Sequence, residues 1–128
     1  MNHKILNHDM IDQVYTRLIN STMWLAEKEM NHNEATAALE QAKVNVTNAG
    51  LEGSNADLRK AYLLDRTELE RLNVTITKEE LDNARTVHEV ERLTLRTLEM
   101  HARLAEILHE DKRLRVQGRG RRRRSTRA

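Results

Sequence analysis

The chain of 128 residues contains no cysteine, no proline and no phenylalanine. Without cysteine it can form neither a disulfide bond nor a thiolate metal site. Only Tyr15, Trp24 and Tyr62 are aromatic, whereas globular cores of this size usually rely on aromatic side chains. A third of the residues are charged, and four glycines are the only helix breakers. This composition predicts long helices or a coiled coil.

The sequence also lacks the motifs that catalysis requires. None of its three serines lies in a nucleophile-elbow context, and it has no glycine-rich phosphate loop. The Glu-x-x-His spacing of helical di-metal sites occurs at Glu29 and His32 and again at Glu106 and His109. A di-metal site also needs further carboxylates that bridge the two metals, and none is evident among the apolar residues that would face a helical core. We therefore predict a protein that is not an enzyme, with no metal site and no cofactor.

Long apolar runs are missing as well. None approaches the ~18 residues that a membrane-spanning helix needs. The N-terminal stretch MNHKILNHDM has no apolar region of the kind found in secretion signals. We therefore expect a cytoplasmic location and no membrane partner.

Charge is divided unevenly along the chain, which the formal net charge of +2 conceals. Residues 112–128 hold nine of the 22 Lys and Arg residues and no acid. The preceding residues therefore combine thirteen basic residues with all 20 acids, a net charge of −7. A basic tail on an acidic body indicates two functional parts.

Apolar spacing predicts a first helix from about Asp9 to Ala49. Ile11, Val14, Leu18 and Leu25 follow one another at steps of three, four and seven residues, which is typical of an amphipathic helix. Gly50 suits a helix C-terminus, and Gly53 suits a turn. Ser54 is a reasonable N-cap for a second helix. We expect residues 1–8 to be a flexible N-terminus.

A second long helical segment follows this turn, so the sequence predicts an all-α protein built as a long antiparallel helical hairpin over residues 9–111, with its turn near 49–55. Thr77-Lys-Glu-Glu80 fits a capping box, and the stretch near Asn31 is poor in apolar residues. If the helices break at both places, the alternative is a four-helix bundle.

A hairpin of this length leaves apolar stripes uncovered, so we expect it to form an oligomer. The predicted oligomer interface is a set of apolar residues on the second segment: Leu69, Leu72, Ile76, Leu95, Leu98, Ala102, Ala105 and Leu108.

The basic tail carries the strongest functional signal. Two glycines and mutual repulsion among arginines predict disorder from Val116 onward. Arginine's planar guanidinium group suits phosphate, and a dense run of cations favours binding to nucleic acid of any sequence through counterion release. Such a run is also compatible with an anionic membrane surface, a nuclear targeting signal, an acidic protein partner or a tail that only aids solubility. The predicted nucleic-acid-binding residues are Lys112, Arg113, Arg115, Arg119, Arg121, Arg122, Arg123, Arg124 and Arg127.

The layout of the chain resembles small all-helical proteins encoded by bacteriophages. The resemblance rests on Met23-Trp-Leu-Ala26, on a turn at Gly50 to Asn55, and on Asp57-Leu-Arg-Lys-Ala-Tyr62. It covers roughly residues 20 to 110 and extends to the general plan of phage recombination mediators, which are oligomers that load a recombinase onto single-stranded DNA. It implies an accessory role in the host cytoplasm. The arginine tail departs from this plan, which leaves a packaging role open.

The sequence thus predicts a non-enzymatic accessory protein that binds DNA or RNA through its tail and assembles through its helical body. The alternative is an adaptor, a virion component or an inhibitor of a host factor that binds a second protein through its helix faces. Deletion of the tail separates the two hypotheses, because only the first function requires it.

Overall fold

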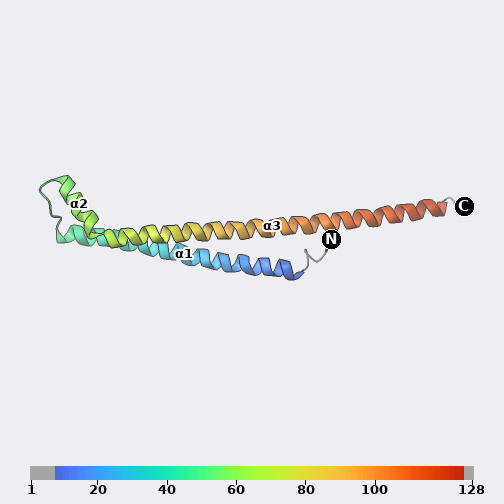
Figure 1. Cartoon of the computed structure of the whole chain (residues 1–128), viewed down its shortest axis with the longest axis horizontal. Coiled ribbons are helices and arrows are strands. Elements are labelled where there is room, and N and C mark those ends of the chain that lie inside the picture. The colour runs from blue at the N-terminus through green and yellow to red at the C-terminus, as the bar shows by residue number, and fades with distance from the viewer. Residues whose placement is uncertain (1–7, 126–128) are drawn as a thin grey trace. The chain divides into compact units, whose positions relative to one another are not determined.

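A computed structural model describes residues 8–125 as three helices, with no strand in that range. They are α1 (His8–Ala49), α2 (Ala56–Arg66) and α3 (Glu68–Ser125) (Figure 1). The all-α prediction is therefore confirmed. Neither α1 near Asn31 nor α3 near Thr77 is interrupted, so the alternative four-helix bundle is wrong.

The described chain divides into two compact units. One contains α1 up to Leu18 together with α3 from Glu91 onward, and the other contains residues 19–90. Each unit pairs a piece of α1 with a piece of α3. In both pairs, contacts join rising residue numbers on α1 to falling numbers on α3, so the two pieces run antiparallel.

The first unit has a small apolar core. Val14 of α1 packs against Leu95 and Leu98 of α3, with Leu18 partly buried beside them. Polar contacts border this core: the Tyr15 hydroxyl donates to the Glu99 carboxylate at 3.0 Å, and Arg17 and Glu91 form an ion pair at 3.5 Å. The core is sparse because one helix pair can cover only one stripe on each helix.

The second unit has a more polar seam between its helices. Ala35, Leu81 and Ala84 are its buried apolar residues. Apart from Asn31 and Lys43, which are also half-buried, the buried or half-buried residues of α1 in this unit recur at alternating steps of four and three. This is the spacing of a two-stranded coiled coil, and the residues are Ser21, Leu25, Lys28, His32, Ala35, Leu39, Ala42 and Val46. Three of these eight side chains, those of Ser21, Lys28 and His32, are polar. Their burial could not be predicted from the spacing of apolar residues alone.

The turn between α1 and α2 depends on two glycines. Gly50 ends α1 with φ +104, and Gly53 has φ +142. A Cβ on Gly53 would lie only 2.7 Å from the Arg59 nitrogen, so both backbone angle and space require glycine there. The N-cap of α2 is Asn55, whose side chain accepts from the Leu58 N–H at 2.9 Å, and not Ser54 as the sequence predicted.

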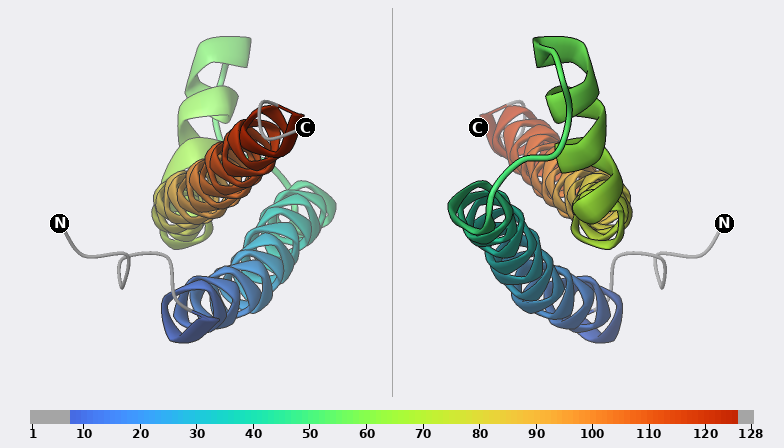
Figure 2. Two further views of the ribbon diagram at one scale, coloured as in Figure 1. Left: turned by 90° about the vertical axis from the view of Figure 1, so that its right-hand side faces the viewer. Right: turned by 90° about the vertical axis from the view of Figure 1, so that its left-hand side faces the viewer.

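An interruption that the sequence did not predict separates α2 from α3 at Thr67, and α2 stands at an angle to α3 (Figure 2). The Thr67 side chain is fully buried, and its hydroxyl donates to the Leu63 carbonyl at 2.8 Å. The Thr67 backbone N–H donates to the same carbonyl at 3.2 Å. Such threonine bonding to the carbonyl four residues earlier bends helices.

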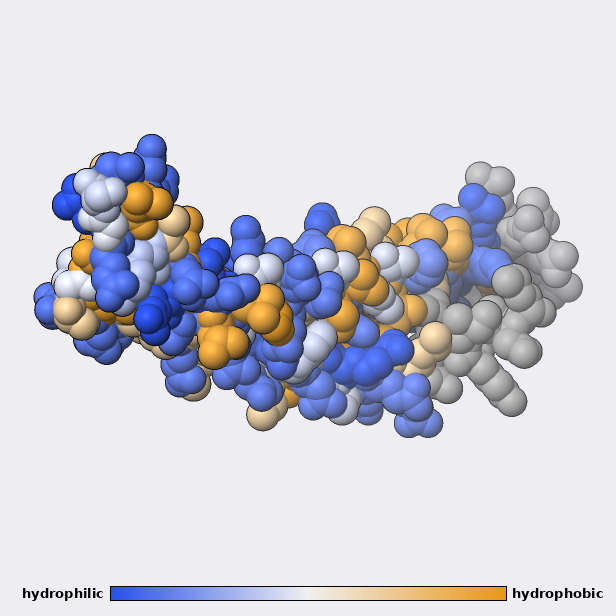
Figure 3. All heavy atoms as spheres, turned by 60° about the vertical axis from the view of Figure 1, so that its left-hand side comes forward, coloured by the Kyte–Doolittle hydropathy of each residue, from blue (hydrophilic) through white to orange (hydrophobic). Residues whose placement is uncertain are grey.

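Much apolar surface remains exposed. On the face shown in Figure 3, apolar patches lie among hydrophilic residues. The exposed large apolar residues include Met23 and Met30 on α1 and Leu69, Leu72 and Leu104 on α3. Among the described residues, no helix is long and apolar enough to cross a membrane.

Candidate nucleic-acid interface

The candidate interface lies at the C-terminal end of α3. This helix continues through Ser125, so the disorder predicted from Val116 onward is not found between residues 116 and 125. The side chains of Lys112, Arg113 and Arg115 are exposed. Arg119 and Arg121 to Arg124 lie on the helical backbone, whereas Arg127 falls outside the described residues.

Two properties of arginine explain why this segment is helical. Arginine is among the better helix-forming residues, and cations near a helix C-terminus interact favourably with the helix dipole. Repulsion between arginines and the backbone freedom of Gly118 and Gly120 favour disorder, but the two properties of arginine outweigh them here. From Lys112 to Ser125 the helical backbone sets successive residues about 1.5 Å apart along one axis. The eight cations from Lys112 to Arg124 occupy about 20 Å of helix.

One acid accompanies the start of the basic segment. The Asp111 carboxylate lies 3.2 Å from Arg115 Nε, one helical turn away. Both side chains are at least half exposed, so water screens this pair and its contribution to stability is small. Asp111 is the last acid in the sequence, so the residues after it carry nine cations and no carboxylate side chain. The sequence at the end of α3 therefore carries a dense run of positive charge, of which Lys112, Arg113 and Arg115 have exposed side chains.

The residues predicted to form an oligomer interface fall into two groups. Leu95 and Leu98 belong to the chain's own core with Val14, so they are not available to a second chain, and their assignment to an oligomer interface is wrong. Ala102 is half-buried. The remaining predicted residues are exposed: Leu69, Leu72, Ile76, Ala105 and Leu108.

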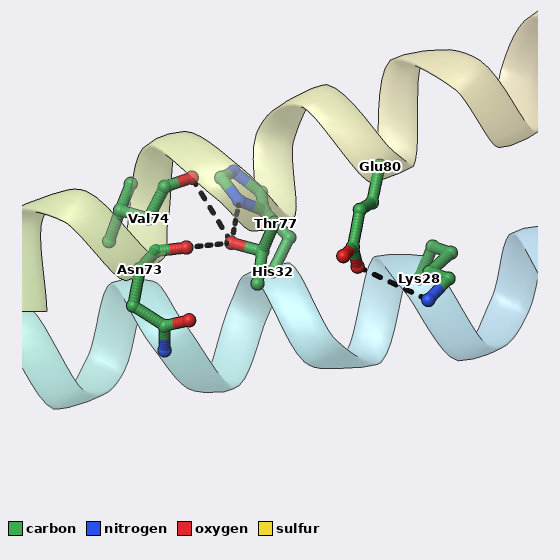
Figure 4. Close-up of polar contacts among 6 residues, drawn as sticks. All are labelled: Lys28, His32, Asn73, Val74, Thr77 and Glu80. Carbon is green, nitrogen blue, oxygen red and sulfur yellow. Dashed lines mark hydrogen bonds and ion pairs between the residues drawn. The ribbon is translucent and has the colours of Figure 1, made fainter.

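The seam of the second unit contains polar side chains that the sequence analysis did not select (Figure 4). Lys28 Nζ lies 3.1 Å from a Glu80 carboxylate oxygen. His32 Nδ1 lies 3.2 Å from the Thr77 hydroxyl, which also donates to the Asn73 carbonyl at 2.8 Å. Thr77 therefore lies in the interior of α3 and is not the N-cap of a helix.

A similar contact joins Ser21 to His88, whose Nδ1 lies 3.2 Å from the serine hydroxyl. Polar pairs at coiled-coil core positions fix the alignment of two helices at some cost in stability. His32, one of the two histidines in a Glu-x-x-His step, thus contacts a hydroxyl group. In the part of the chain that the structure describes, no three His, Asp or Glu side chains gather as metal ligands would.

Comparison of the chain with protein-family models, with curated proteins and with solved structures finds no match. Arguments about its function therefore rest on its own residues.

Proposed function

We propose that the chain is a non-enzymatic accessory protein that binds nucleic acid of any sequence through the basic end of α3. The observation that carries this proposal is the segregation of charge: nine cations and no acid after Asp111, behind a body of net charge −7. The cations whose side chains are described are exposed. Duplex DNA carries one negative charge per about 1.7 Å, so a short cationic helix can contact several phosphates.

The composition of the basic segment favours contacts to the phosphate backbone of the nucleic acid over recognition of its bases. The basic segment contains no aromatic residue, so it cannot stack bases in the way that dedicated single-strand binders do. The acidic body repels the same polyanion. The tail would then lie on the nucleic acid while the body is held away and remains available for assembly.

By its resemblance to small helical phage proteins, we place this activity in phage recombination, replication or packaging, within the host cytoplasm. The second candidate is an adaptor, a virion component or an inhibitor of a host factor. It is favoured by the exposed apolar residues of α3, such as Leu104, Ile107 and Leu114, which suit a protein partner.

A salt titration of binding tests the first candidate. The full chain is compared with a chain ending at Asp111, using duplex DNA, single-stranded DNA and RNA, and circular dichroism checks that both remain helical. If all nine tail cations contact duplex phosphates, log affinity against log salt falls with a slope near −8, about 0.9 per phosphate.

We expect the shortened chain to lose this binding. Binding that survives the truncation with the same slope would remove the tail from the proposal. Absence of binding by the full chain at low salt would favour the second candidate, because the helix faces would then be the functional surface.

A further inference from the structure

A second stripe with coiled-coil spacing runs along α3, and none of the residues that the structure describes covers it. In the first unit it consists of Leu93, Met100, Ile107 and Leu114, which are separated by seven residues each, with Leu104 between them. All five are at least half exposed. They do not belong to the stripe that packs on α1, which contains Leu95, Leu98 and Ala102.

The two stripes lie on different sides of the helix. With 100° per residue, Leu95 and Leu98 fall roughly opposite Leu93, Leu104 and Ile107. The outer stripe therefore remains uncovered when α1 is packed in place. It spans three heptads, or about 32 Å of helix. One core position of each heptad is apolar throughout, and the other holds Thr97, Leu104 and Asp111 in turn.

Flanking charges indicate what covers this stripe. Leu104 and Asp111 lie at core positions of the heptads. Arg103 and Glu110 directly precede these two residues in the sequence, and both are exposed. In an antiparallel pair of identical helices, residues in this position face their equivalents on the other helix. If Leu104 packs against Ile107 of the second copy, Arg103 lies opposite Glu110 of the second copy, and Glu110 lies opposite Arg103. The stripe is thus complementary to itself.

Other alignments bring like charges together. A shift of one heptad in one direction places Arg103 against Arg103 and Arg96 against Glu110, so a like-charge pair is added to two opposite-charge pairs. A shift in the other direction places Glu110 against Glu110. A parallel pair in register places Asp111, itself at a core position, against Asp111 and sets two tails of nine cations side by side. Like charges held face to face disfavour each of these arrangements.

We infer that the face of α3 formed by Leu93, Met100, Leu104, Ile107 and Leu114 binds a second copy of this chain in antiparallel orientation, with Arg103 paired to Glu110 across the interface. This inference specifies the assembly step of the proposed function. It does not require the tail to bind nucleic acid.

Charge exchange tests the pairing in the full chain without nucleic acid. The dissociation constant of the dimer is measured by sedimentation for the wild type, R103E, E110R and the double variant R103E/E110R. Each single variant places like charges together twice, so we expect its dissociation constant to rise about tenfold or more. The double variant restores both pairs and should return to within about threefold of the wild type.

Cysteine crosslinking tests the orientation, since the natural chain has no thiol. R103C and E110C are mixed and oxidised, and the products are separated by mass. The inferred arrangement predicts that the mixed disulfide predominates, because the mixed dimer also retains one Arg103–Glu110 pair. Crosslinking of R103C to itself, or of E110C to itself, at the same rate would overturn the inference.

An Ile107→Asp variant, matched with Val44→Asp at an exposed position on α1, shows whether the stripe itself is required. Only the first should abolish the dimer, and equal loss in both would contradict the inference. A wild-type chain that sediments as a single copy up to high concentration would overturn it as well. The salt slope of nucleic-acid binding is measured separately, so either proposal can fail while the other stands.

Discussion

Polar side chains occupy positions between α1 and α3 that are usually apolar in paired helices. Ser21 with His88, and His32 with Thr77, place hydroxyl groups and imidazole rings within hydrogen-bonding distance in the second unit. A buried polar group is costly unless it finds a partner. Sliding one helix past the other would separate these pairs, so they favour one alignment of α1 and α3 over its neighbours.

Tyr15 offers a direct probe of helix pairing in the first unit. Its hydroxyl donates to Glu99, and this hydrogen bond, with the negative charge of that carboxylate, raises the pKa of Tyr15 above 10.0. Deprotonation puts two negative charges side by side. This contribution to stability is therefore complete below pH 10 and is lost as the pH rises through the elevated pKa of Tyr15.

We predict that Glu99→Gln lowers the pKa of Tyr15 toward the ordinary value, because the carboxylate charge is removed while the side-chain shape is kept. Tyrosinate absorbance against pH measures the change in the full chain, and a Tyr15→Phe variant identifies which signal belongs to this residue. An identical titration curve for wild type and Glu99→Gln would show that α1 and α3 do not meet here as described.

At the level of the helix, burial distinguishes leucines that look equivalent in the sequence. Leu98 is 9% exposed and packs against Val14, whereas Leu69 is 78% exposed. We predict that Leu98→Ala lowers the free energy of unfolding by about 2–3 kcal/mol, since it removes buried methyl groups and leaves a cavity. Leu69→Ala should change it by no more than about 0.5 kcal/mol.

Chemical denaturation of both variants measures this difference, with dilute protein so that self-association does not contribute. Equal destabilisation by the two substitutions would mean that both leucines are buried, as expected if Leu69 and Leu98 shared one interface.

The extent of α1 and the turn after it could be predicted from the sequence, because an uninterrupted run of helix-compatible residues ends at Gly50 and Gly53. The two ends of α3 could not, since it begins after an unsignalled interruption at Thr67 and continues through two glycines to Ser125. The seam could not be predicted in full. Apolar spacing selected Leu69, Leu72 and Ile76, whereas the buried stripe at that end of α3 passes through Thr67 and Thr77. Apolar periodicity identifies faces that can be buried, but it cannot decide which face receives α1.

The cations of the candidate interface could be predicted from the sequence, but the helical conformation of the segment that carries them could not. Charge repulsion and two glycines favoured disorder, while the helix propensity of arginine and the helix dipole favour a continued α3. The interruption at Thr67 has no glycine or proline to signal it. It depends instead on a single threonine that bonds back to the Leu63 carbonyl.

For the whole molecule, the proposed function depends on the division of charge between a basic tail and an acidic body. In this proposal the tail would supply attraction to phosphate, and the body would supply surfaces for assembly. Pairing of two copies through the outer stripe of α3 would bring two tails into one complex. A weak contact by each tail then adds to the other through effective concentration, without any new kind of contact.

Whether the arginines of the tail contact phosphate can be measured from the salt dependence of duplex binding after four of them are neutralised. Arg121, Arg122, Arg123 and Arg124 are replaced together by glutamine, which retains helix propensity, and a matched variant carries lysine at the same positions. The account predicts that the slope falls from about −8 to about −4.5 with glutamine and stays near −8 with lysine. An unchanged slope in the glutamine variant would contradict it.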